Sequence, residues 1–137
     1  MPVKERRLFI SHGWKYDEYY KTVVSWLNEE PYFKWKNYSV PKHDACEETT
    51  EKGLKKCLTN QIKPVQGVII IAGMYAAYSK WIDYEIDEAI RMEKVIIGIK
   101  PRGQERTPRK VQEAAEKYGR LVGWNRESLI RAIRGLI

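Results

Sequence analysis

The chain has 137 residues, a length that fits a single domain (1–137) with its own hydrophobic core. Hydrophobic residues make up 43% of it and charged residues 31%, a balance typical of globular proteins, and its longest apolar runs are too short to span a bilayer. The net charge is +7, but the basic residues are spread along the chain and follow no nucleic-acid-binding motif. Neither a membrane protein nor a nucleic-acid-binding protein is therefore expected.

Short apolar runs predict the strands of a parallel sheet. In chain order the predicted strands are Arg7–Ser11, Asn37–Val40, Gly67–Ala72, Val95–Ile99 and Arg120–Trp124. Four of them are apolar on both faces, which is typical of a parallel sheet that helices cover on both sides. The second run alternates poorly, so we expect it near an edge of the sheet.

Helical stripes of apolar residues follow each predicted strand. The first predicted helix has an apolar stripe from Tyr16 to Leu27, and the second runs from Leu54 to Ile62 and ends before Pro64. The remaining predicted helices are Tyr78–Met92, Arg109–Tyr118 between Pro108 and Gly119, and Arg126–Arg134 with Asn125 as its N-cap. This strict alternation of strands and helices predicts a doubly wound α/β fold, a three-layer sandwich with helices on both faces of the sheet.

Two further features of the sequence favour ordinary roles. Cys46 and Cys57 have no partner residues at zinc-binding spacing. The N-terminal segment lacks the apolar stretch of a signal peptide, so we expect a cytoplasmic protein in which both cysteines are reduced thiols. The densest basic stretch, 100–110, is interpreted as a solvated loop, with a phosphate-bearing small ligand as the alternative. No metal site is predicted.

The helix predicted at Tyr78–Met92 carries one carboxylate in an unusual place. At about 100° per residue, Ile82 and Ile86 fall on the apolar stripe, whereas Asp83 and Asp87 point to solvent, the latter one turn before Arg91. Glu85 lies on the flank of the stripe, one turn after Trp81. The sequence therefore places a carboxylate at the rim of the core, beside a tryptophan.

The position of this carboxylate along the fold favours a binding site. In doubly wound sheets, ligands bind beyond the carboxyl ends of the strands, at the switch point in strand order. The segments that follow the first and third strands, 11–14 and 73–81, are expected to flank that crevice, and the helix with Glu85 begins in the second of them. The fingerprints of P-loop nucleotide binding, dinucleotide binding and the nucleophile elbow are all absent.

Three stretches of the sequence resemble one family. They are "RLFISHGW" at the first strand, the loop "NYSVPKHDA", and "AGMYAAYSKWIDYEID" after the third strand. Together they resemble the TIR-like domains, in particular the bacterial and archaeal subgroup that includes the TIR protein of Thoeris antiphage defence. The resemblance implies a flavodoxin-like fold with five parallel strands in the order 2-1-3-4-5.

The resemblance also implies an activity and a site. Many members of the family cleave NAD⁺ as their substrate, without a further cofactor, and some cyclise the ADP-ribose product into a signal. The family's catalytic glutamate, four residues past a tryptophan, corresponds to Glu85. The resemblance assigns Ser11, His12 and Trp14, after the first strand, to the substrate pocket. The further candidates for substrate binding are Asp44, Ser79, Tyr75 and Trp81, the last two because their rings are able to stack on nicotinamide or adenine. Many TIR domains carry an arginine two residues after the serine that ends the first strand, where this chain has Gly13.

The resemblance extends to partners. It implies self-association or contact with other TIR-domain proteins, and a downstream effector that responds to a soluble nucleotide signal. The loop at about Pro41 to Glu48 corresponds to the segment that gates the pocket in the family. We expect weak activity until self-association or a trigger fixes this loop.

Other interpretations of the same residues stay open at this point. In a purely structural interpretation, Glu85 pairs with Lys80 or Lys94 and Trp81 packs on the core. In the same interpretation, His12 is a hydrogen-bonded loop residue and Ser79 caps the helix. For the whole chain, the alternatives to an NAD⁺-cleaving enzyme are a non-catalytic TIR-like interaction module and a flavodoxin-like nucleotide or flavin binder.

Overall fold

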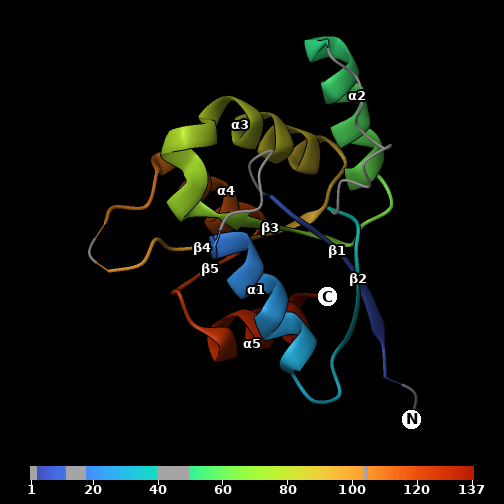
Figure 1. Ribbon diagram of the computed structural model, residues 1–137, viewed down its shortest axis with the longest axis vertical. Helices are drawn as coiled ribbons and strands as arrows, with labels where there is room; N and C mark the ends of the chain where they lie inside the picture. The colour runs from blue at the N-terminus through green and yellow to red at the C-terminus, as the bar shows by residue number, and fades with distance from the viewer. Residues whose placement is uncertain (1–2, 12–17, 40–49, 104) are drawn as a thin grey trace.

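A computed structural model describes residues 3–11, 18–39, 50–103 and 105–137 (Figure 1). The strands are β1 (Glu5–Ile10), β2 (Lys34–Asn37), β3 (Gly67–Ile71), β4 (Val95–Ile99) and β5 (Gly119–Val122). The helices are α1 (Glu18–Glu29), α2 (Glu51–Ile62), α3 (Tyr75–Arg91), α4 (Arg109–Tyr118) and α5 (Arg126–Leu136), with the short 3-10 helix η1 (Ala72–Met74) before α3. The predicted alternation of strands and helices is therefore confirmed.

The strands form one parallel sheet in the order β2-β1-β3-β4-β5. Helices α1 and α5 pack together on one face, and α2, α3 and α4 follow one another on the other (Figure 1). All five residues of β3, at the centre, are buried, because helices cover both of its faces. The structure thus confirms the flavodoxin-like α/β fold and the strand order expected from the sequence.

The edge strand β2 lies about three residues earlier than predicted. The apolar pattern predicts a strand at Asn37–Val40, whereas the strand in the structure is Lys34–Asn37. Within it, Lys34 and Lys36 are exposed while Trp35 and Asn37 are half-buried, an alternation of period two. Such a pattern with lysines at every second position is typical of an edge strand, and the predicted position near an edge of the sheet is confirmed.

Helix boundaries follow local chemistry closely in two places. Asn125 caps α5 as predicted, since its Oδ1 accepts a hydrogen bond of 3.0 Å from the Ser128 backbone N–H. Helix α4 spans Arg109–Tyr118 as predicted, and Gly119 follows it. A Cβ at Gly119 would lie 1.9 Å from the backbone oxygen of Ile96, so the close approach of β5 to β4 requires a glycine there.

Cys57 is disulfide-bonded, so the expectation of a reduced thiol is wrong for this residue. Cys46, the other cysteine of the chain, lies outside the described residues. Spacing along the sequence does not reveal whether a cysteine meets a second sulfur, because that depends on how the segments fold in space.

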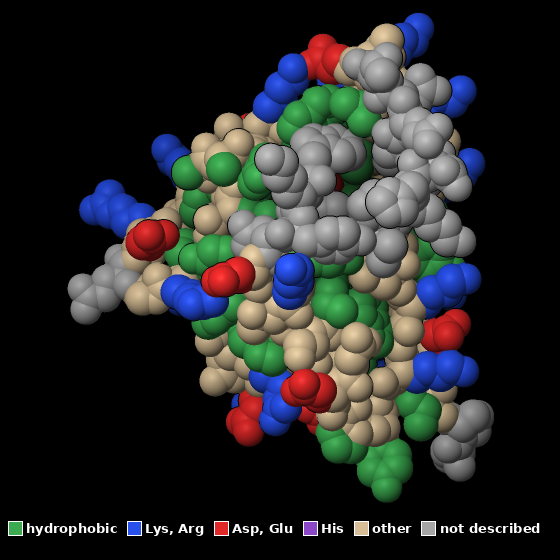
Figure 2. All heavy atoms as spheres, viewed as in Figure 1, with side chains coloured by type: hydrophobic (Ala, Val, Ile, Leu, Met, Phe, Trp, Pro, Cys, Tyr) green, Lys and Arg blue, Asp and Glu red, His purple; other side chains and the backbone are tan. Residues whose placement is uncertain are grey.

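Charge is distributed evenly over the face that Figure 2 presents. Lysine and arginine side chains lie around its rim among acidic side chains, and they do not gather over one element (Figure 2). Several exposed or partly exposed basic residues have acidic partners, as Lys110 has in Asp87 at 2.7 Å. Among the described residues, no helix combines the length and apolar composition needed to cross a bilayer.

Candidate active site

Glu85 lies inside the protein rather than at the rim of its core. Only 2% of its surface is exposed, and its Oε1 is buried without a hydrogen-bond partner among the described residues. Burial raises the pKa of its carboxyl well above the ordinary value, because the charged form loses hydration. The sequence analysis placed this flank of α3 at a half-dry boundary, and the structure corrects that expectation.

The two lysines considered as partners of Glu85, Lys80 and Lys94, have other partners in the structure. Lys80 forms an ion pair with Glu51 at the start of α2, and the Nζ of Lys94 donates a hydrogen bond of 2.8 Å to the backbone oxygen of Lys63. Neither lysine therefore satisfies the Glu85 carboxyl. A buried carboxyl without a partner costs stability, and such groups are frequent at functional sites.

Trp81 lies on the same side of α3 as Glu85, one turn earlier. Its ring packs against the hydrophobic core and remains partly exposed. The Nζ of Lys80 lies 5.4 Å from the centre of this ring. Trp81 therefore contributes to packing and also keeps part of its ring exposed, one turn before Glu85.

The start of α3 differs from the predicted boundary. The helix begins at Tyr75 rather than Tyr78, and Tyr78 has non-helical angles (φ −132°, ψ 28°) that kink it. The Tyr75 hydroxyl donates a hydrogen bond of 2.7 Å to Asp83, which raises the pKa of Tyr75 to about 12. Ser79 lies inside the helix, directly after the kink, so it does not occupy the N-cap position of α3.

Ser11 follows β1 and is completely buried. Its backbone N–H donates a hydrogen bond of 2.8 Å to the Ile69 oxygen, and its Oγ accepts one of 3.4 Å from the Ile71 N–H. These contacts fix the carboxyl end of β1 to that of β3, where α3 begins after η1. Contact of Ser11 with a substrate stays a prediction.

Part of the predicted site lies outside the described residues. This holds for His12, Trp14 and Asp44, and for the predicted gate from Pro41 to Glu48. The residues that the structure does bring to the β1/β3 switch point and to α3 are Ser11, Tyr75, Ser79, Trp81 and Glu85. Among the described residues, no group of three or more His, Cys, Asp or Glu side chains is placed to hold a metal ion.

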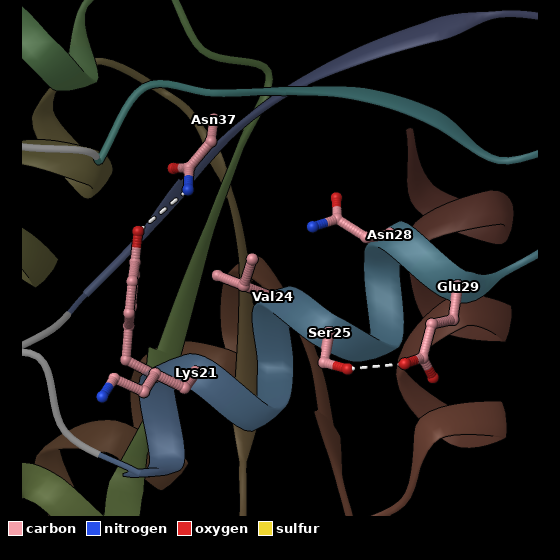
Figure 3. A pocket seen from close by; sticks show the side chains of 7 residues that line it. Lys21, Val24, Ser25, Asn28, Glu29 and Asn37 are labelled. Atoms are coloured by element: carbon pink, nitrogen blue, oxygen red, sulfur yellow. Dashed lines mark hydrogen bonds between the residues drawn. The ribbon is translucent and has the colours of Figure 1, made fainter.

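A separate groove runs along α1 beside β2 (Figure 3). It has a volume of about 670 Å³, and its lining residues are Tyr20, Lys21, Val24, Ser25, Asn28, Glu29 and Asn37. It is wide open, and several of its polar groups are already engaged, as in the 2.9 Å hydrogen bond from Ser25 to Glu29. None of the predicted site residues lines this groove.

Glu88 is a buried acidic residue that the sequence analysis missed. Arg91 was expected to pair with Asp87, but its Nε and Nη2 donate to Glu88 at 2.7 and 2.9 Å, and Asp87 pairs with Lys110 instead. The Oγ1 of Thr59 on α2 also donates to Glu88, at 2.6 Å. Both acids stand at allowed helical spacings from Arg91, so the sequence does not discriminate between them.

The environment of Glu88 predicts a loss of stability in acid. The Arg91 guanidinium, helped by the Thr59 and Tyr84 hydroxyls, lowers the pKa of Glu88 to about 2 against the opposing effect of burial. The stabilisation is therefore complete above the ordinary carboxyl pKa of about 4.3 and is lost as the pH falls toward 2. Glu88→Gln is expected to lower the free energy of unfolding at pH 7 by about 1–3 kcal/mol.

Urea denaturation at pH 7 and pH 3 measures this effect, and the difference between wild type and Glu88→Gln should shrink at pH 3. The matched control is Glu113→Gln, which removes an exposed pair with Arg109 on α4 and should cost at most about 0.5 kcal/mol. Equal stability of Glu88→Gln and wild type at pH 7 would contradict the prediction.

The chain matches a known protein family over most of its length. The family described as "Thoeris protein ThsB, TIR-like domain" matches residues 9–106, from the end of β1 through β4, and this range includes the helix that carries Trp81 and Glu85. A search of curated proteins found no significant match. Because the family match covers well over half of the chain, the protein belongs to the TIR-like domain family of the Thoeris protein ThsB.

Proposed function

We propose that this protein cleaves NAD⁺ at the bond between nicotinamide and ribose, and that Glu85 is its catalytic residue. The observation that carries the proposal is the Glu85 carboxyl, which is buried and lies one turn after Trp81 in a TIR-like chain, and whose Oε1 has no hydrogen-bond partner in the part of the chain that the structure describes. Retaining such a group in a core costs free energy, and a catalytic role accounts for it.

The chemistry matches a buried carboxylate. When the N-glycosidic bond breaks, its electron pair leaves with nicotinamide, which becomes neutral, and positive charge develops on the ribose as in glycoside cleavage. An ionised carboxylate in a site with little water stabilises that charge far better than it would in bulk solvent. Water that attacks the anomeric carbon and loses a proton gives ADP-ribose, and attack by a group of the substrate itself gives a cyclic product.

The residues near Glu85 have complementary roles in this proposal. The exposed part of the Trp81 ring stacks on a base or on nicotinamide, and the Tyr75 ring offers a second aromatic surface. The hydroxyl of Tyr75 stays protonated because it donates to Asp83, so it serves in positioning rather than as an acid or base. NAD⁺ is the substrate, and no further cofactor is required.

The proposal also implies a role in antiphage defence. The family description names a Thoeris protein, and Thoeris is an antiphage defence system, so the ADP-ribose product would serve as a signal in that defence. Self-association or contact with other TIR-domain proteins would complete the site, and a downstream effector would read the nucleotide signal.

A non-catalytic TIR-like interaction module is the second candidate, and one observation favours it. Glu85 is 2% exposed, so a substrate reaches its carboxyl only after side chains around it move. In a module that only binds other proteins, the residue would remain permanently closed off. Release of nicotinamide separates the two candidates.

The test is chromatography of NAD⁺ after incubation with protein across a concentration series. We expect free nicotinamide together with linear or cyclic ADP-ribose, and specific activity that rises with protein concentration. NADH is the matched control and should stay intact, because its reduced ring carries no positive charge and is a poor leaving group. If no nicotinamide forms even at high protein concentration, the interaction module becomes the better assignment.

A further inference from the structure

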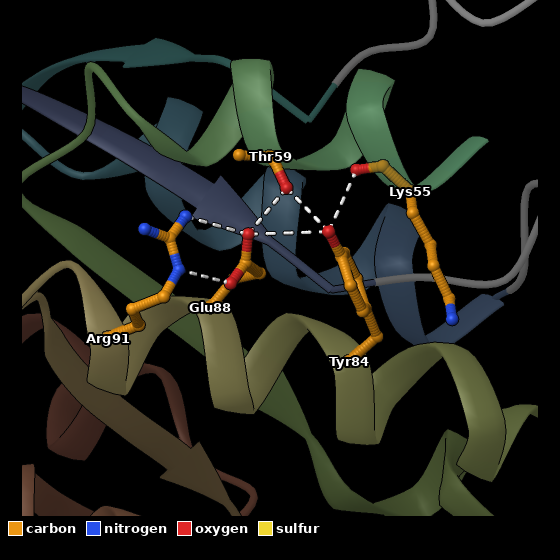
Figure 4. Close-up of polar contacts among 5 residues, drawn as sticks. All are labelled: Lys55, Thr59, Tyr84, Glu88 and Arg91. Carbon is orange, nitrogen blue, oxygen red and sulfur yellow. Dashed lines mark hydrogen bonds and ion pairs between the residues drawn. The ribbon is translucent and has the colours of Figure 1, made fainter. Parts of the chain in front are cut away.

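A partly buried polar network joins α2 to α3 beside the candidate active site (Figure 4). The Tyr84 hydroxyl lies 2.6 Å from the Thr59 Oγ1, 3.2 Å from the backbone oxygen of Lys55 and 3.3 Å from the Glu88 Oε1. Thr59 also donates to Glu88, and Arg91 holds that carboxylate from the other side. Two residues of α3 thus contact α2 through several hydrogen bonds.

Glu85 lies between the part of α3 that faces the sheet and the part that faces α2. At about 100° per residue, Ile82 and Ile86 point to the sheet, and both are fully buried. Tyr84 and Glu88 point to α2, as their hydrogen bonds show (Figure 4). Glu85 falls between these two directions, on the flank of α3 next to its contacts with α2.

The described residues around Glu85 bury its carboxyl and offer it no compensating charge. The strand β3 below α3 is apolar throughout. On α2, Glu51 is engaged by Lys80, and Lys55 lies over the Tyr84 ring at 5.6 Å. On α3, Glu88 and Arg91 neutralise each other. Burial alone accounts for the direction in which the pKa of Glu85 moves.

We propose that Thr59, Tyr84 and Glu88 are positioning residues that hold α2 across this flank and thereby keep water away from the Glu85 carboxyl. The inference rests on the proposed function, in which Glu85 acts in its ionised form at a site with little water. The network does not touch the substrate. It determines how tightly α2 covers the reacting carboxyl, and so at what pH the enzyme works.

The test uses Thr59→Val and Tyr84→Phe, which remove one hydroxyl each and keep the size of the side chain. In wild type, activity should rise with pH as Glu85 loses its proton. In both variants α2 is held less tightly, water reaches Glu85, and its pKa falls toward the ordinary value. We expect this acidic limb of the pH–rate profile to move to lower pH by about one unit, with a lower kcat at the optimum and little change in KM.

Two controls separate positioning from general stability. Thr59→Ser keeps the hydroxyl and should restore the wild-type profile, whereas Tyr118→Phe removes a tyrosine hydroxyl on α4, outside the network, and should leave the profile unchanged. The Glu85 side chain is also titrated directly by carbon NMR in wild type and in Thr59→Val, a measurement that needs no catalysis.

The outcomes are distinct. If the Glu85 titration and the acidic limb stay where they are in both Thr59→Val and Tyr84→Phe, the positioning role is wrong and the network serves stability alone. If the NMR titration of Glu85 moves to lower pH while wild type releases no nicotinamide, the positioning role stands and the proposed enzymatic function fails.

Discussion

Glu85→Gln is expected to lower nicotinamide release from NAD⁺ on the order of a hundred-fold or more, with the fold intact. Glutamine has nearly the same shape but carries no charge, so it does not stabilise the positive ribose that forms when nicotinamide leaves. Chromatography of NAD⁺ incubated with each protein at equal concentration measures the effect. Comparable rates in the variant and wild type would remove Glu85 from the mechanism.

Although Glu85→Gln should lower activity, it should not lower stability at neutral or alkaline pH. Since the folded-state pKa of Glu85 is raised, the folded protein binds a proton more tightly than the unfolded chain, and stability falls as the pH rises from the ordinary carboxyl pKa toward the folded one. Glutamine removes this dependence. Glu85→Gln should therefore be at least as stable as wild type at pH 8, and its advantage should disappear near pH 4.

The matched control is Glu116→Gln on α4, where the carboxylate accepts a hydrogen bond from Gln112 on the surface. It should change neither the activity nor the pH dependence of unfolding. If Glu85→Gln instead unfolds at a lower denaturant concentration than wild type at pH 8, the carboxyl is not the uncompensated group that the structure shows, and the loss of activity would not be evidence of catalysis.

Gly119→Ala is expected to lower the free energy of unfolding by about 3 kcal/mol or more, which corresponds to a fall in the melting temperature of roughly 10 °C. The added Cβ would lie 1.9 Å from the Ile96 backbone oxygen and 2.7 Å from the carbonyl carbon. Gly119 stands opposite Ile96 in the pairing of β4 with β5. Backbone in a paired strand does not move aside without loss of that pairing.

Thermal unfolding followed by circular dichroism measures this effect. Gly135→Ala is the matched control, because a Cβ there meets nothing within 4 Å and the residue lies in α5. Alanine is the better helix former, so this control should be neutral or stabilising by up to about 1 kcal/mol. A melting temperature of Gly119→Ala within two degrees of wild type would show that β5 does not approach β4 as closely as described.

Local sequence chemistry was sufficient for most of the fold. The apolar runs at Gly67–Ile71 and Val95–Ile99 are β-rich and apolar on both faces, and that combination predicts buried parallel strands. Asn125 predicts the start of α5 because its side chain satisfies a free N–H of the first turn. The edge strand was misplaced since β2 is short and half-exposed, and so has a weak apolar pattern.

The candidate site, like the fold, depends partly on the sequence alone and partly on the tertiary structure. The spacing of Trp81 and Glu85 is a property of the sequence, as is the position of Glu85 on the flank of an apolar stripe. Whether that flank is open or closed depends on which other segments of the chain pack beside α3. Only the tertiary structure brings Thr59 to Tyr84 and Glu88, buries Glu85, and leaves its Oε1 without a hydrogen-bond partner among the described residues. Periodicity describes one helix at a time, whereas burial depends on which second helix packs against it.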